Sequence, residues 1–175
     1  MVANRAIGKP MSTIIDSEVP ARDRPYSSKQ MGDACEMLVA AELTLAGVPA
    51  LKAPDNWPGY DVIAQPRDGS QPLRISVKSR TFKRGAAFVE YWASDVFDWL
   101  AIVLLPGATE PKRRVFLIPH ATADACARRD SPEAQTADQR YWRIDKIAKT
   151  FPQFEDNFTL TPNGKFVHES TDHEA

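Results

Sequence analysis

Three residues in the first half of the sequence could together act on a phosphate group. Asp61 follows the turn-forming pair Pro58–Gly59 at the start of a short apolar segment, and Lys78 lies on the next alternating segment. Glu36 lies further upstream in an amphipathic stretch. A carboxylate binds a hard divalent cation through oxygen, and a lysine ammonium can stabilise charge that develops on a phosphoryl group. This set of residues therefore indicates a site that holds a divalent metal beside a phosphate.

Each of these residues also has a structural interpretation. A carboxylate beside a turn, such as Asp61, can accept hydrogen bonds from nearby backbone N–H groups. Lys78 can be a solvent-facing strand residue, and Glu36 can be a solvated helix residue. Ser76 shares a strand face with Lys78 because it lies two residues earlier, and it can be an ordinary strand residue. Both interpretations stay open at the level of these residues.

The elements that must position these residues follow from the apolar pattern. Apolar residues at steps of three and four predict a helix over 28–46, with Ser27 or Ser28 as N-cap and Gly47 just past its end. The apolar run 99–105 predicts a central strand that is buried on both faces and lies beside strand 73–79, with helices on both sides of the sheet. Further elements are a short strand within 48–54, strands over 60–64, 88–92 and 115–118, and helices over 121–129 and 141–150.

Length and composition indicate one soluble globular domain. The chain has 175 residues, 43% of them apolar and 26% charged, with a net charge of -1. We expect a flexible arm over 1–26, a domain over 27–166 and an acidic, disordered tail over 167–175. The two cysteines lack zinc-ligand spacing, and there is neither a long apolar run nor a signal-like leader, so we expect a cytoplasmic protein with no membrane partner.

A basic segment lies next to the candidate site. Residues 70–90 contain five basic residues against the single acidic residue Glu90. Such a strip can contact a phosphate backbone, or it can be a solvated strand face that protects a sheet edge. Trp57, in the loop before Asp61, could stack on a base. The candidate nucleic-acid contacts are Arg74, Arg80, Lys83, Arg84 and Trp57.

Aromatic residues gather in the otherwise polar C-terminal part. They include Tyr141, Trp142, Phe151, Phe154 and Phe158. Such a cluster is typical of an interface core, which favours a homodimer. The alternative is that these side chains cover the sheet within one chain.

Residues 32–118 resemble the PD-(D/E)xK nuclease superfamily. The stretch GDACEMLVAAELTLAG resembles its opening helix, GYDVIA its acid strand and RISVKSR its x-V-K strand. The segments SDVFDWLAIVLL and RVFLIP are similar to the branch that contains group I intron homing endonucleases. The resemblance implies an α/β, restriction-endonuclease-like fold, a single domain with a mixed central sheet flanked by helices.

The resemblance also implies a function and a role for each residue. It implies a Mg²⁺-dependent endonuclease that hydrolyses phosphodiester bonds in DNA, with RNA as an alternative. Asp61 would bind the metal, Glu36 would support it, and Lys78 would be the catalytic lysine. Ser76 stands at the second acidic position, where the superfamily usually has Asp or Glu. The alternative function is therefore an inactive or weakened nuclease-like module that binds nucleic acid or protein.

Overall fold

The fold begins with a helix whose start is fixed by its own sequence. The computed structural model describes residues 25–55, 57 and 59–165, so nearly all of the predicted arm and tail lies outside the described residues. Helix α1 spans Ser28–Leu45. The Ser27 hydroxyl accepts a hydrogen bond from the Gln30 N–H at 3.2 Å, and the Gln30 side chain accepts one from the Ser27 N–H at 2.8 Å. Gly47 follows the helix with a φ of 84°, which favours glycine. The predicted helix over 28–46 is confirmed.

A five-stranded mixed sheet forms the centre of the molecule. Its order is β1-β2-β3-β5-β6. Only the β3–β5 pair is parallel, and the other neighbours are antiparallel. The prediction of an α/β domain with a mixed central sheet is confirmed. The strands are β1 (Ala50–Lys52), β2 (Val62–Ala64), β3 (Leu73–Thr81), β5 (Trp99–Leu105) and β6 (Arg114–Pro119).

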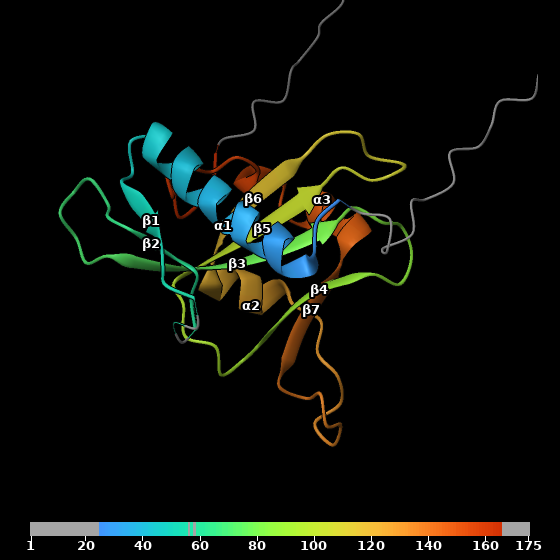
Figure 1. Ribbon diagram of the computed structural model, residues 1–175. Helices are drawn as coiled ribbons and strands as arrows, with labels where there is room; N and C mark the ends of the chain where they lie inside the picture. Colours follow the sequence, from blue (N-terminus) through green and yellow to red (C-terminus); the bar gives the residue numbers. More distant parts are fainter. Residues whose placement is uncertain (1–24, 56, 58, 166–175) are drawn as a thin grey trace, which may run out of the picture.

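The two faces of this sheet are covered by different elements. Helix α1 lies over one face, and α2 (His120–Cys126) lies on the other side (Figure 1). A separate two-stranded sheet, β4 (Phe88–Trp92) with β7 (Gln139–Arg143), contributes to the second side. The predicted central position of β5 is confirmed, because its residues from Trp99 to Leu104 are buried and alternate between the two cores.

The predicted helix over 141–150 is wrong in its first part. Residues 139–143 form β7, which pairs antiparallel with β4. Only a 3₁₀ turn over Ile144–Lys146 and a short helix α3 over Ile147–Thr150 follow, before a second 3₁₀ turn over Pro152–Phe154. The apolar spacing within 141–150 fits a helix by chance, whereas the strand depends on a partner far away in the sequence. None of the described helices is long and apolar enough to cross a membrane.

The C-terminal aromatic side chains cover the sheet within one chain. Trp142, Phe151 and Phe154 are at most 3% exposed and belong to the core on the side of α2. The argument that these residues form an interface core is therefore wrong. Their burial follows from the second face of β5, which is fully apolar and needs a cover.

Candidate active site

An open pocket lies between α1, the end of β1 and the connection that leads to β2. Its volume is about 370 Å³. Glu36 from α1 and Asp61 from the segment before β2 both line it, so the fold brings these two predicted carboxylates into one pocket. The other lining residues are Lys29, Gly32, Asp33, Lys52, Ala53, Pro54, Asp55, Trp57 and Tyr60.

The carboxylate of Asp61 is fixed by the backbone of β3. Its Oδ2 accepts a hydrogen bond from the Val77 N–H at 2.6 Å and one from the Ser76 hydroxyl at 3.5 Å. The Asp61 N–H donates to the Ile75 carbonyl at 2.9 Å, and its carbonyl accepts from the Ala53 N–H at 2.8 Å. Asp61 is thus held between β1 and β3. One carboxylate oxygen takes the structural role foreseen from the sequence, while the side chain still lines the pocket.

Lys52 is a pocket residue that the sequence did not reveal. Its ammonium lies 2.7 Å from Asp55 Oδ1, 2.9 Å from Glu36 Oε2 and 3.6 Å from Asp33 Oδ1. Hydrogen bonds to Asp55 and Glu36 raise the Lys52 pKa, so the ammonium stays charged. Lys52 belongs to a three-residue strand, which is too short to show a pattern in the sequence. Its role follows only from the contact with α1.

Lys29 completes this network of charges. Its ammonium bonds Asp33 at 2.9 Å and Asp55 at 2.8 Å. Hydrogen bonds from Lys29 and then Lys52 lower the pKa of Asp55 to about 2. Both lysines therefore neutralise part of the negative charge around the pocket.

Ser76 and Lys78 do not line this pocket. They lie in register with Leu100 and Ile102 of the parallel neighbour β5, which belong to the core on the side of α2. Residues in register on adjacent strands point to the same face, so Ser76 and Lys78 face away from α1. Ser76 is 3% exposed and contacts Asp61, whereas Lys78 is half-buried and forms no hydrogen bond or ion pair with the described residues. Asp61 connects the two regions, because it lines the pocket and also accepts a hydrogen bond from Ser76.

The donor set of the pocket fits a magnesium ion bound with water. No group of three or more His, Cys, Asp or Glu residues in the described part of the chain could hold a metal. Mg²⁺, however, is commonly bound by one or two carboxylates while it keeps several waters. Asp61 and Glu36 provide two such carboxylates in one open pocket. They are the residues that would hold the ion.

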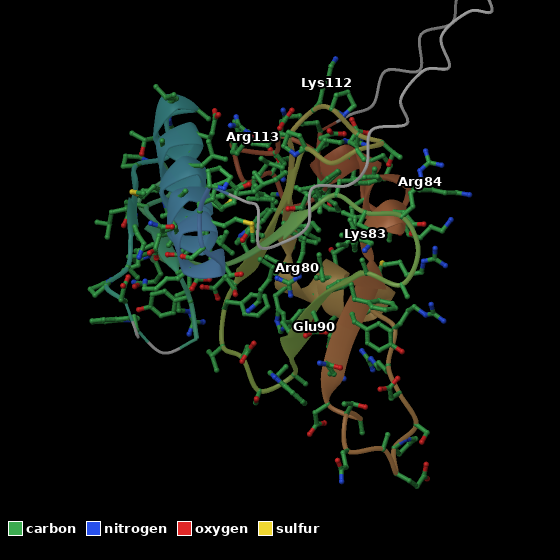
Figure 2. All side chains as sticks on the ribbon, turned by 45° about the vertical axis from the view of Figure 1, so that its right-hand side comes forward. Arg80, Lys83, Arg84, Glu90, Lys112 and Arg113 are labelled. Atoms are coloured by element: carbon green, nitrogen blue, oxygen red, sulfur yellow. The ribbon has the colours of Figure 1, made fainter. Side chains whose placement is uncertain are left out.

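The predicted nucleic-acid contacts fall into two groups. Arg74 forms a two-pronged ion pair with Asp98 at 2.9 and 3.0 Å, and Arg80 donates to the carbonyls of Ser79 and Phe88. These two guanidinium groups hold the strands together. Lys83 and Arg84 are exposed on the loop from β3 to β4, away from α1 (Figure 2).

Trp57 lies at the rim of the pocket. It is 49% exposed, and its indole N–H donates to the Tyr60 hydroxyl. The two rings meet edge to face, with centroids 6.4 Å apart. This contact leaves an aromatic surface at the pocket, as base stacking requires.

Comparisons with known proteins identify structural relatives alone. No family model and no curated protein matches the sequence. A bacterial homing endonuclease, I-Ssp6803I, has a TM-score of 0.41 and 21% identity, over 54% of this chain and 70% of that one. The Holliday junction resolvase Hjc of Archaeoglobus fulgidus has a TM-score of 0.41 and 16% identity, over 66% of this chain and 90% of that one. The chain is thus similar in structure to parts of two nucleases.

Proposed function

We propose that this protein is a metal-dependent nuclease that hydrolyses phosphodiester bonds in DNA. The observation that carries the proposal is the meeting of Asp61 and Glu36 in one open pocket, with the x-V-K strand bonded directly to Asp61. Their spacing in the sequence and their resemblance to the PD-(D/E)xK motifs add support.

The residues of the chain have distinct roles in this mechanism. Asp61 and Glu36 would hold a Mg²⁺ ion, which when bound polarises a phosphoryl oxygen and lowers the pKa of a water. The backbone of β3 fixes Asp61, so one carboxylate oxygen stays oriented without reorganisation. Lys78 lies two residues after Ser76 on β3, about 7 Å further along the strand. Its ammonium would stabilise the charge that develops on a phosphate held at Asp61.

Nicking of supercoiled plasmid tests this proposal. We expect Mg²⁺-dependent nicking by the full chain, which Asp61→Asn and Lys78→Met each lower by about 10²-fold or more, as is typical for the loss of a transition-state contact. Asp68→Asn is the matched control, because Asp68 is exposed in the loop between β2 and β3, where its carboxylate accepts a hydrogen bond from the Ser70 N–H. Equal activity of the Asp61→Asn variant and the unchanged protein would contradict the proposal.

A second candidate function is a module that binds nucleic acid or another protein without cutting. Ser76 favours it, because serine replaces the second acidic residue and adds no negative charge to hold a metal. In this case the protein would retain a labelled duplex or a partner protein, with no nicking at any Mg²⁺ or Mn²⁺ concentration. The same plasmid assay, combined with a binding assay, separates the two functions.

Nucleases that cut both strands of a duplex often use two active sites, so we propose a homodimer for this activity. Light scattering at micromolar concentration would then give twice the 19.5 kDa of one chain. Trp142, Phe151 and Phe154 are buried within one chain, so they do not supply the surface of such a dimer. The mass of one chain, together with nicking but no cutting of both strands, would argue for a monomer that cuts one strand.

A further inference from the structure

We propose that Lys52 is an internal cation that holds Glu36 and competes with a divalent metal for it. The inference rests on the proposed function, because it concerns the same metal-binding carboxylates. Lys52 would thus act as a positioning residue. It keeps the Glu36 side chain in the pocket and sets the metal concentration at which Glu36 is released to a metal.

The Lys52–Glu36 pair is the most shielded ion pair of the pocket network. The Lys52 side chain is 23% exposed and that of Glu36 is 18% exposed, with 2.9 Å between Nζ and Oε2. In contrast, Lys29 is 67% exposed and bonds the 53% exposed Asp55. Water and salt screen a shielded pair less than an exposed one. Lys52 is therefore the cation that holds Glu36 most firmly among the described residues.

The backbone places Lys52 beside the segment that carries Asp61. Lys52 is the last residue of β1, and it lies opposite Val62 in the sheet. The next residue, Ala53, donates its N–H to the Asp61 carbonyl. The ammonium is consequently anchored to the same strand pair as Asp61, while its hydrogen bonds reach across to α1. This places the positive charge of Lys52 on Glu36, in the same pocket that Asp61 lines.

The charge balance of the pocket makes this competition measurable. Its lining residues include four carboxylates, from Asp33, Glu36, Asp55 and Asp61, and two lysines. A cation that binds Glu36 must break the bond to Lys52 or share the carboxylate with it. Removing the ammonium therefore abolishes a competitor and leaves Glu36 available.

Binding of Mn²⁺ to the full chain, followed by the electron paramagnetic resonance signal of free Mn²⁺, tests the inference without relying on activity. We expect Lys52→Met to bind Mn²⁺ about three- to tenfold more tightly than the unchanged protein, the effect of losing an ion pair worth about 1 kcal/mol. Lys29→Met is the matched control, because it removes an equal charge from the same pocket but makes no bond to Glu36. We expect it to change the affinity by about twofold at most.

The double variant with Glu36→Gln shows whether Lys52 acts through Glu36. We expect Lys52→Met to give no gain in affinity when Glu36 is already Gln. Lys52→Gln, which retains a polar end, replaces Lys52→Met if circular dichroism shows that the latter does not fold.

Three results would overturn the inference. Equal gains in Lys52→Met and Lys29→Met would show a general charge effect. Unchanged or weaker binding by Lys52→Met would show that Lys52 does not compete, and the proposed function would still stand if binding depends on Asp61. Absence of Asp61-dependent binding in every variant would overturn both proposals together.

Discussion

At Asp61, one carboxylate serves the fold and the candidate site together. Its Oδ2 accepts a hydrogen bond from the Val77 N–H of β3, while the same side chain lines the pocket. The sequence suggested a backbone cap and a metal ligand as alternatives, yet the geometry allows both. Because an asparagine can still accept this hydrogen bond, Asp61→Asn separates the loss of charge from the loss of the cap.

Ser76 offers a direct test of how the site depends on a second acid. We expect Ser76→Asp to cost about 2–4 kcal/mol of unfolding free energy without metal, since the new carboxylate would lie close to that of Asp61. Adding Mn²⁺ should recover this loss and stabilise the variant more than the unchanged protein. Thermal unfolding with and without Mn²⁺ measures both effects.

Ser79→Asp is the matched control for that experiment. Ser79 is also buried on β3, but it faces the opposite side of the sheet from Ser76, three residues further on. The control should lose stability with no recovery by Mn²⁺. The same recovery in both variants would mean that metal binds elsewhere.

Asp55 gives the pocket a predictable response to acid. Its pKa is lowered from the ordinary 3.8 to about 2 by hydrogen bonds from Lys29 and then Lys52. Its stabilising contribution is therefore complete above about pH 4 and is lost as the pH falls toward 2. We expect Asp55→Asn to be less stable than the unchanged protein at pH 5–7, with the difference vanishing near pH 2. Urea midpoints across this range measure it. A constant difference would show that the two lysines do not hold this carboxylate.

Among the elements, the β4–β7 sheet packs on the core through buried aromatic residues, of which Trp142 is one. Trp142 is 3% exposed, its ring lies 5.8 Å from those of Tyr91 and Phe151, and its indole N–H donates to the Cys126 carbonyl. We expect Trp142→Ala to lower the free energy of unfolding by about 3–5 kcal/mol. Urea unfolding followed by circular dichroism measures this loss. Trp92→Ala, on the same small sheet but 45% exposed, should cost about 0.5 kcal/mol or less.

The elements that the sequence predicted well are those with local signals. Helix α1 has a capping serine, a regular apolar face and a terminal glycine, and β5 is a long apolar run. Strand β7 was missed because its only signal is its pairing with β4. Lys52 was missed for the same reason, since its partners Glu36 and Asp55 are reached only when β1 packs on α1. The burial of Trp142 could not be told from an interface because both environments select aromatic residues.

Over the whole molecule, most guanidinium groups near the sheet are paired with acids. Arg74 bonds Asp98, Arg114 bonds Glu155, and Arg143 bonds Asp145, each through two nitrogen atoms. A basic residue in the sequence is therefore a poor guide to a phosphate contact unless its partners are known.

Arg84 and Arg74 should thus differ in their effect on DNA binding. Arg84 is exposed and forms no hydrogen bond or ion pair with the described residues. We expect Arg84→Ala to reduce the slope of log K against log salt by about 1. Arg74→Ala should leave the slope unchanged and lower stability, because its guanidinium is held by Asp98. Fluorescence anisotropy of a labelled duplex measures both slopes, and a reversed pattern would contradict this division.

The separation of β4 from its partner has a consequence for synthesis on the ribosome. All five strands of the main sheet end by Pro119, whereas β4 pairs, among the described residues, only with β7 at 139–143. A nascent chain can therefore assemble the main sheet while Val89 and Tyr91 still await a partner strand. During that interval the apolar side of β5 that faces away from α1 lacks the part of its cover that Trp142, Phe151 and Phe154 supply. We expect a chain stalled before β7 to be a substrate for chaperones that bind exposed apolar segments.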